Sequence, residues 1–323
     1  MGKIIQLMTY SFQKILSRFG SLLIVYVTLG VLLGLGGLLK PHLLSLGSLV
    51  SICRWSSILG LAAIGQTLVM ISGGIDISVG AVVFLVSILA SALMKGQDTL
   101  ALPISLACLG IGVLCGLING IGVNLLKIPP VVMTLSLSLI LNGIVWIYTG
   151  GVTYGGPAPS LVKFAGKVIL GVFPLPFVVW LVIALFFIGV MRLTILGRLF
   201  HAIGNNPVAA HYSGVNVPIV SIVGYALCGL FSAATGLSLL GYLNMATLRF
   251  SDIYTMGSIA AAVIGGTSFF TGLGTISGTI CGTIIMRVIF NLLLMFQIPE
   301  AGRMVANGLI ILVVVALYSL RRR

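Results

Sequence analysis

The residue type that stands out most in this chain is the carboxylate of Asp76, which lies in the stretch "ISGGIDISVG" at residues 71–80. The chain has only four acidic residues among 323, and the other three are Asp98, Asp252 and Glu300. A carboxylate in an apolar stretch can transfer protons, form an ion pair that acts as a gate, or accept backbone hydrogen bonds at the start of a helix. The three roles require different surroundings.

The residues beside Asp76 favour the helix-start role. Gly73 and Gly74 can end one helix, and Asp76 directly precedes the apolar run "ISVGAVVFLVSILASALM". We therefore expect its carboxylate to accept an amide hydrogen bond from Ser78 or Val79, as an N-cap next to the positive end of the helix dipole. Gating through an ion pair and proton transfer are the alternatives. Gly73, Gly74, Asp76, Ser78 and Gly80 together form the motif that we assign to this helix start.

Other reactive residue types form no catalytic or metal-binding pattern. The three histidines are His42, His201 and His211, and the last two lie in one loop without a carboxylate or cysteine nearby. The five cysteines show no CxxC spacing, and no GxxxxGK[ST] phosphate loop occurs. We therefore expect no enzyme activity, metal or cofactor in this chain; if it uses ATP, another chain hydrolyses it.

The composition is that of an integral membrane protein. Hydrophobic residues make up 59%, charged residues 7%, and the mean hydropathy is +1.26, far outside the range of soluble domains. Continuous apolar runs of roughly 20 residues, the length needed to cross a bilayer, recur along the chain. The expected fold class is all-α, a polytopic transmembrane helix bundle of about ten spans in a single domain, residues 1–323. These spans are predicted at 20–38, 47–72, 77–94, 99–125, 129–149, 169–191, 218–240, 253–270, 272–296 and 302–320.

Interruptions in the apolar pattern predict broken or re-entrant helices. The stretches 41–56 and 253–270 are broken or mildly polar, so either could be a half-helix. The first half contains "ISGGIDISVG" and the second contains "VIGGTSFFTGLG" at 263–274. Because five spans per half is an odd number, this similarity predicts an inverted repeat.

Glycines at every fourth position predict close helix contacts. A missing side chain lets a second backbone approach a helix face. Two such trios occur, Gly112, Gly116 and Gly120, and Gly274, Gly278 and Gly282.

The basic residues predict the orientation. They occur in the N-terminal lead at 1–19, in the loop at 192–217 and in the tail at 321–323. With an even number of spans all three lie on one side, which the positive-inside rule assigns to the cytoplasm. The formal net charge of +13 is spread over the loops, so lipid headgroups rather than nucleic acid are the expected anionic partner.

The loop at 192–217 carries the signals of a short helix. Asn206 is a good N-cap, Pro207 suits the first helical position, and Gly214 suits the residue after the end. A helix this short is marginal alone. It rests either on the bundle itself or in a groove of a separate protein, which would receive the face of Val208, Ala209 and Tyr212.

Three stretches resemble a known family. "TLVMISGGIDISVGAVV" at 67–83, "ILGRLFHAIGNNPVAAHYSGVNV" at 195–217 and "SIAAAVIGGTSFFTGLGTISGT" at 258–279 are similar to the membrane permease of ribose-type sugar ABC importers, in the branched-chain amino acid/ribose permease family. Branched-chain amino acid members usually have an "INFAHG"-like stretch where this chain has "IDISVG". The chain departs from sugar members at Met256, Gly257 and Ser258 and at Thr271, which leaves the sugar open.

The resemblance implies an ATP-driven importer permease that translocates a monosaccharide or related polyol. The implied partners are a cytoplasmic ABC ATPase that holds ATP and magnesium, an extracellular or periplasmic sugar-binding protein, and a second permease subunit, identical or not. The implied location is the bacterial plasma (inner) membrane, with both termini cytoplasmic. The segment that would couple to the ATPase comprises Gly197, Arg198, Gly204, Asn206, Pro207, Val208, Ala209, Ala210, Tyr212 and Gly214.

The path of the solute is predicted from small and hydrogen-bonding residues in the spans. A neutral sugar needs such groups more than it needs charges, which makes Gln66, Thr67, Ser72 and Asn142 the candidates, with packing as their alternative role. The alternative functions are a proton-coupled secondary carrier with Asp76 as its proton site, and an ABC permease for another small solute.

Overall fold

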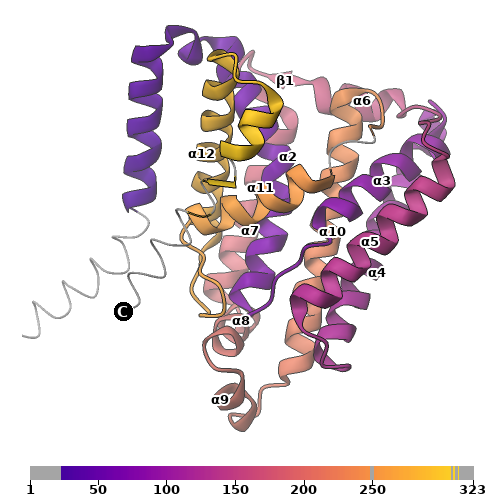
Figure 1. Ribbon diagram of the computed structural model, residues 1–323, viewed down its shortest axis with the longest axis vertical. Coiled ribbons are helices and arrows are strands. Elements are labelled where there is room, and N and C mark those ends of the chain that lie inside the picture. The colour runs from indigo at the N-terminus through magenta and orange to yellow at the C-terminus, as the bar shows by residue number, and fades with distance from the viewer. Residues whose placement is uncertain (1–22, 248–250, 307, 310–311, 313–323) are drawn as a thin grey trace, which may run out of the picture.

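The computed structural model describes residues 23–247, 251–306, 308–309 and 312, and the side chains of 251 and 252 are not part of that description. It is a helix bundle with one two-stranded hairpin (Figure 1). The elements in chain order are a helix at Leu23–Leu39, η1 (Pro41–Leu44), α2 (Leu46–Ile71), α3 (Val79–Met94), η2 (Asp98–Leu100), α4 (Ala101–Asn124), α5 (Pro130–Thr149), α6 (Pro159–Gly166), β1 (Val168–Ile169), β2 (Phe173–Pro174), α7 (Leu175–Leu193), α8 (Ile195–Asn205), α9 (Pro207–Tyr212), α10 (Val217–Leu243), α11 (Ser251–Ile264) and α12 (Ile276–Met295).

The helices match the predicted spans closely in the described part of the chain. Six helices are long and apolar enough to cross a membrane, namely α2, α4, α5, α7, α10 and α12. The span that contains α4 starts at Asp98, with η2. Three shorter apolar helices, at Leu23–Leu39, α3 and α11, match further spans. The lead at 1–19 and most of the span at 302–320 lie outside the described residues.

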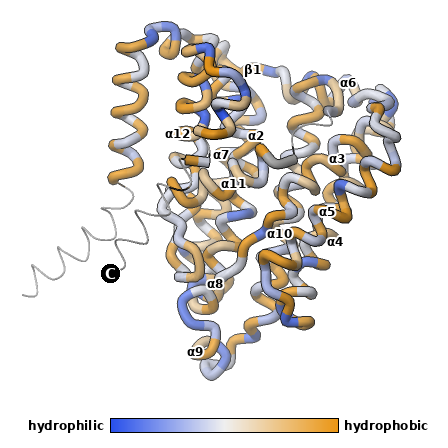
Figure 2. The backbone as a smooth tube through the Cα atoms, viewed as in Figure 1, coloured by the Kyte–Doolittle hydropathy of each residue, from blue (hydrophilic) through white to orange (hydrophobic). Residues whose placement is uncertain are grey.

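Two helices form the centre of the bundle. Most residues of α2 and half of those of α10 are buried, and the shorter helix α3 is buried along most of its length, whereas most residues of α4, α5 and α7 are at least partly exposed. Leucine and isoleucine side chains on these outer helices, such as Leu139 and Leu185, are largely exposed. The distribution is that of a bundle whose outer surface faces lipid (Figure 2).

Two details of the predicted spans are wrong. Residues 41–56 are not a half-helix, because the 3-10 turn η1 leads into one continuous helix, α2, whose N-cap Ser45 accepts a hydrogen bond from the amide of Ser48. The span predicted at 169–191 begins only at Leu175, because the antiparallel pair β1 and β2 takes up residues 168–174. That hairpin is the one departure from an all-α fold among the described residues.

Two Gly-Gly stretches interrupt the spans as non-helical segments. The first separates Ile71 at the end of α2 from Val79 at the start of α3, and the second separates Ile264 at the end of α11 from Ile276 at the start of α12. α11 is thus a half-length helix, as the broken pattern at 253–270 predicted.

Both interruptions lie at the same end of the bundle. A Cβ on Gly204 of α8 would collide with the carbonyl of Ile71 and lie 2.8 Å from the Cα of Gly272, and a Cβ on Gly73 would lie 3.6 Å from Gly204. The inverted repeat stays a prediction.

Candidate functional site

The predicted short helix is α9, and its first turn is capped as the sequence indicated. The Asn206 side chain accepts hydrogen bonds from the amides of Val208 and Ala209, each at 3.0 Å. Pro207 occupies the first helical position, where its missing N–H costs nothing. The N-terminal signals are confirmed.

The other end of α9 is closed by glycine. Gly214 has a φ of 84°, which a residue with a side chain rarely adopts. Its amide bonds to the carbonyl of His211 at 2.9 Å, and the amide of Val215 bonds to the carbonyl of Ala210 at 3.0 Å. This pair of bonds is the Schellman motif, which stops the helix.

The preceding helix, α8, was not predicted. Residues 192–217 were interpreted as one polar loop with a single short helix, but Phe200 and Ile203 are fully buried against α2, α7 and α10. Their spacing, with Leu196 and Leu199 beside them, is the period of an amphipathic helix. Gly197 touches the Met191 carbonyl, which lets α8 fold back on the end of α7, and Arg198 is exposed.

The two helices form an arm, residues 195–214, that projects from one end of the bundle (Figure 1). α9 is attached by Ala210, which is only 6% exposed. On its free side Val208 is 62% exposed and Tyr212 is 85% exposed, and Ala209 is exposed too. Apolar side chains held outward on a capped helix form a surface that could bind another protein.

The arm is in direct backbone contact with both non-helical stretches. Gly204 lies against Ile71 and Gly272, and the ring Nδ1 of His201 is 2.7 Å from the carbonyl oxygen of Gly272. The arm is therefore packed against the stretch after α2 and the stretch before α12 at the same time.

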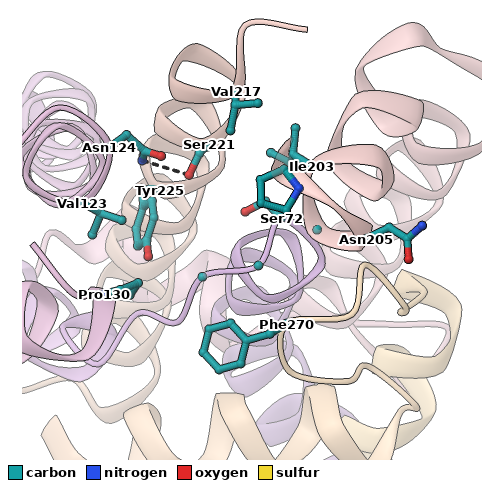
Figure 3. Close-up of a pocket in the computed structure, with 14 residues that line it drawn as sticks. Ser72, Val123, Asn124, Pro130, Ile203, Asn205, Val217, Ser221, Tyr225 and Phe270 are labelled. Carbon is teal, nitrogen blue, oxygen red and sulfur yellow. Dashed lines mark hydrogen bonds between the residues drawn. The ribbon is translucent and has the colours of Figure 1, made fainter. Parts of the chain in front are cut away.

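A pocket of about 270 Å³ opens beside this contact (Figure 3). Its walls come from the end of α2, the arm, the α4–α5 connection and the start of α10. The Asn124 side chain donates to the Ser221 hydroxyl at 2.9 Å across it. The lining residues are Ser72, Gly73, Gly74, Val123, Asn124, Pro130, Ile203, Gly204, Asn205, Pro207, Val217, Ser221, Tyr225 and Phe270.

Asp76 lies fully inside the bundle and is 2% exposed. Its Oδ1 accepts hydrogen bonds from the amide of Ser78 at 2.8 Å, from the Ser78 hydroxyl at 2.6 Å and from the Asn119 side chain at 3.3 Å. The expected bond to Ser78 is thus present. Helix α3 begins at Val79, so Ser78 and not Asp76 stands at the N-cap position, and its own side chain makes no cap bond.

The segment around Asp76 is fixed by side chains from four surrounding helices. Besides Asn119 of α4, Thr134 of α5 accepts from the amide of Ile77 at 3.1 Å, and the Tyr225 hydroxyl of α10 donates to the carbonyl of Ile75 at 3.3 Å. Thr255 of α11 accepts from the amide of Gly80 at 3.0 Å. Non-helical backbone at membrane depth is stable only when its polar groups are paired in this way.

The predicted path residues do not form one group. Gln66 and Thr67 are fully buried near the C-terminal end of α2, where Thr67 shares a 2.7 Å hydrogen bond with Thr279 of α12 and the Gln66 Nε2 has no partner among the described residues. Ser72 lines the pocket and donates to the carbonyl of Val69. Asn142 is half-buried on α5, which packs mainly on α3 and α4. The structure does not bring Asn142 together with the others.

The first glycine trio forms a close helix crossing. A Cβ on Gly112, Gly116 or Gly120 of α4 would collide with the backbone of α10 or lie within 2.9 Å of it. This face was predicted from the four-residue spacing.

The second trio is only partly a helix face. Gly278 and Gly282 of α12 touch the backbone of Gly265 and Ala261 at α11. Gly274 precedes α12, which begins at Ile276, so its predicted place on the same helix face is wrong.

Comparison with known proteins agrees with this architecture. Residues 48–314 match the family described as branched-chain amino acid transport system / permease component. The chain is 35% identical to the galactose/methyl galactoside import permease protein MglC of Escherichia coli, over 92% of this chain and 94% of that protein. It is 31% identical to the ribose import permease protein RbsC of Haemophilus influenzae, over 90% of both chains.

A third relative is the autoinducer 2 import system permease protein LsrC of Enterobacter sp., 34% identical over 94% of this chain and 85% of that protein. No solved structure matches the chain. The resemblance read from the three sequence stretches is confirmed, and the chain belongs to the branched-chain amino acid transport system / permease component family.

Proposed function

We propose that this chain is the permease subunit of an ATP-driven importer that carries a monosaccharide or a related polyol into a bacterial cell. The relatives named as ribose, galactose and autoinducer 2 import permeases support this class of solute. The chain itself would hydrolyse nothing. A separate cytoplasmic ATPase would hold ATP and magnesium, an external sugar-binding protein would deliver the solute, and a second permease subunit would complete the path.

The observation that carries the proposal is the arm. Its capped helix α9 holds Val208 and Tyr212 outward, while Gly204 is in backbone contact with both non-helical stretches. An ATPase bound to α9 would favour the position of the arm that it binds more tightly, and the contact at Gly204 would pass that preference to α2 and α12. Coupling of this kind requires only that the ATPase binds the two forms with different affinity.

The membrane arrangement follows from the same assignment. The arm and both termini would be cytoplasmic, in the inner membrane of a bacterium. The six long helices, the three shorter ones and the span predicted at 302–320 would make about ten crossings in one domain, residues 1–323.

Charge on the free face of α9 tests the proposal. The full-length permease is expressed together with its ATPase, and Val208→Glu and Tyr212→Glu are compared with Leu126→Glu, which adds the same charge to a side chain that is 67% exposed at the same end but outside the arm. We expect the two arm variants to insert and accumulate normally yet lose ATPase co-purification and uptake, because the charge would be desolvated without a partner. Leu126→Glu should keep both.

Ala209→Glu, on the same face, is a third variant with the same expected outcome. Normal uptake in all three arm variants would show that α9 is not where the ATPase binds.

A further inference from the structure

Arg287 is a buried cation in the middle of a membrane-spanning helix. It lies in the second half of α12 and is 8% exposed. Ionisable side chains at such depth are costly and usually mark the path of a transported solute or ion. None of the sequence patterns considered above assigned it a role.

The surroundings of Arg287 are aromatic. The guanidinium carbon lies 5.4 Å from the ring centre of Trp55 and 5.7 Å from that of Phe290, and the guanidinium donates a hydrogen bond to the Tyr254 hydroxyl. Its Nε has no hydrogen-bond partner among the described residues. Aromatic faces attract a cation but do not neutralise its charge or satisfy its N–H groups.

Two more arginines lie against the same group of rings. Arg54 lies over the ring of Tyr242 at 5.0 Å and donates to the carbonyl of Gly166 at 3.3 Å, and Arg303 lies over Phe290 at 4.8 Å. Trp55 connects the ring beside Arg54 to those beside Arg287, since its own ring packs edge-on against Tyr242 with the centroids 5.1 Å apart. We call this group the arginine–aromatic cluster, and it comprises Arg54, Trp55, Tyr242, Tyr254, Arg287, Phe290 and Arg303.

No described carboxylate balances this charge. Among the acidic side chains that the structure describes, Asp76 bonds to Ser78 and Asn119, Asp98 bonds to the amide of Ser160, and Glu300 is exposed. The side chain of Asp252, two positions before Tyr254 in the sequence, lies outside the description. Among the side chains that the structure does describe, no carboxylate pairs with the three guanidinium groups, and the Nε of each is buried and unpaired.

The cluster lies at the end of the bundle away from the arm. Its residues come from the first half of α2, the end of α10, the start of α11, the second half of α12 and, for Arg303, the segment after α12. Arg54 reaches the end of α6, which Figure 1 places opposite α9. If the arm is cytoplasmic, as the proposed function requires, a solute delivered from outside would reach this end first.

We propose that the arginine–aromatic cluster binds an anionic group on the transported solute, and that Arg287 is the residue that selects for it. The favoured solute is a sugar that carries a carboxylate or a phosphate rather than a neutral sugar. A guanidinium binds these planar or trigonal groups through two parallel N–H bonds, and burial from water strengthens the attraction. The rings of Trp55 and Tyr242 supply the apolar face that a sugar ring can pack against. This inference rests on the proposed function and narrows its substrate class.

Matched pairs of sugars test the selectivity. The full-length permease, purified with its ATPase and placed in phosphatidylcholine bilayers, is heated at constant ionic strength with D-galactose or D-galacturonate, and with D-ribose or D-ribose 5-phosphate. The two members of each pair differ at one position, where the second member carries a carboxylate or phosphate in place of a neutral group. We expect at least one anionic member to raise Tm more than its neutral counterpart. Equal shifts within both pairs, including no shift at all, would overturn the proposal.

Variants assign the effect to Arg287. Arg287→Met should weaken binding of the anionic sugar by about 10- to 100-fold, the loss expected for a hydrogen bond to a charged group, while Arg287→Lys should weaken it less because the charge remains. Lys95→Met removes an exposed charge at the same end of the bundle and should leave the discrimination intact. If Arg287→Met fails to fold, the comparison rests on Arg287→Lys and on Arg54→Met, and unchanged discrimination in both would contradict the proposal.

A lipid phosphate is the other source of an anionic oxygen group. A rise in Tm on adding phosphatidylglycerol that Arg287→Met abolishes, with no discrimination between the sugars, would assign the cluster to lipid and overturn the proposal. Failure of the proposed function would be seen separately, as a permease that binds no ATPase, whereas an ATPase-bound permease that prefers neutral sugars would contradict only this inference.

Discussion

Gly204 of the arm lies directly against the carbonyl oxygen of Ile71, the last residue of α2, so closely that a methyl group at Gly204 would overlap that oxygen. The two backbones belong to the segment proposed to bind the ATPase and to the central helix of the bundle. We expect Gly204→Ala to separate them, to cost about 1–3 kcal/mol through overpacking, and to reduce uptake.

The control for this change is Gly189→Ala on α7, where a Cβ meets nothing within 4 Å. Thermal unfolding followed by size-exclusion chromatography, together with solute uptake, measures both variants. Equal behaviour of the two would show that the contact at Gly204 is not needed.

The cap of α9 predicts a graded series at Asn206. Its side chain accepts two amide hydrogen bonds, and loss of such a cap costs about 1 kcal/mol. Because α9 is too short to be stable alone, Asn206→Ala should unfold it and reduce ATPase co-purification, whereas Asn206→Asp and Asn206→Ser should retain it. Pull-down of the ATPase with the tagged permease measures this, and an Asn206→Ala variant that binds as well as wild type would contradict it.

The same logic holds for the other end of the helix. Pro207→Gly combined with Gly214→Val removes the first-turn proline and places a β-branched residue at a φ of 84°. We expect this double variant to accumulate in the membrane without binding the ATPase. Retained uptake would mean that the shape of α9 is not required.

Asp76 predicts an asymmetric outcome for two substitutions. Its hydrogen bonds from the Ser78 amide, the Ser78 hydroxyl and the Asn119 side chain all end on one oxygen, Oδ1, and the amide oxygen of asparagine can accept the same three. Asp76→Asn should therefore keep most transport, while Asp76→Leu should lose stability and transport, since it leaves Ser78 and Asn119 without their acceptor in a buried site.

Uptake and thermal unfolding of the Asp76 variants separate this role from its alternatives. A well-folded Asp76→Asn permease without transport would support an ion-pair gate or a proton site. It would thereby favour the proton-coupled carrier over the importer.

The crossing of α4 and α10 predicts a contrast within one helix. A side chain at Gly116 would collide with the carbonyl of Tyr225, whereas at Gly110, less than two turns away on α4, it would meet nothing within 4 Å. Gly116→Leu should abolish the folded peak in fluorescence-detected chromatography and Gly110→Leu should not.

Gly278→Leu on α12 should fail for the same reason as Gly116→Leu, because Gly278 lies against the Gly265 carbonyl. Normal folding of both leucine variants would remove the argument that these glycines are needed for close packing.

Much of the fold could be predicted because the bilayer imposes simple rules on sequence. Apolar runs of the required length located the six long and three shorter apolar helices but not α6. Local signals at Asn206, Pro207 and Gly214 located α9, since caps depend on neighbouring residues alone. α8 was missed although Phe200 and Ile203 have helical spacing, because the polar residues around them led to the whole segment being interpreted as a loop. The half-helix predicted at 41–56 failed because Ser45 caps a helix that simply continues.

The site depended on contacts that no local pattern contains. The composition and the motif at Asp76 were enough to indicate a membrane permease and a carboxylate bonded to Ser78. Only the packing shows which helices surround that carboxylate and that Gly204 touches both Gly-Gly stretches. The packing also brings Arg54, Arg287 and Arg303 to one group of rings. Trp55 and Arg287, more than 200 positions apart in the sequence, become neighbours only through tertiary packing. The spacing of residues along the sequence does not indicate such pairs.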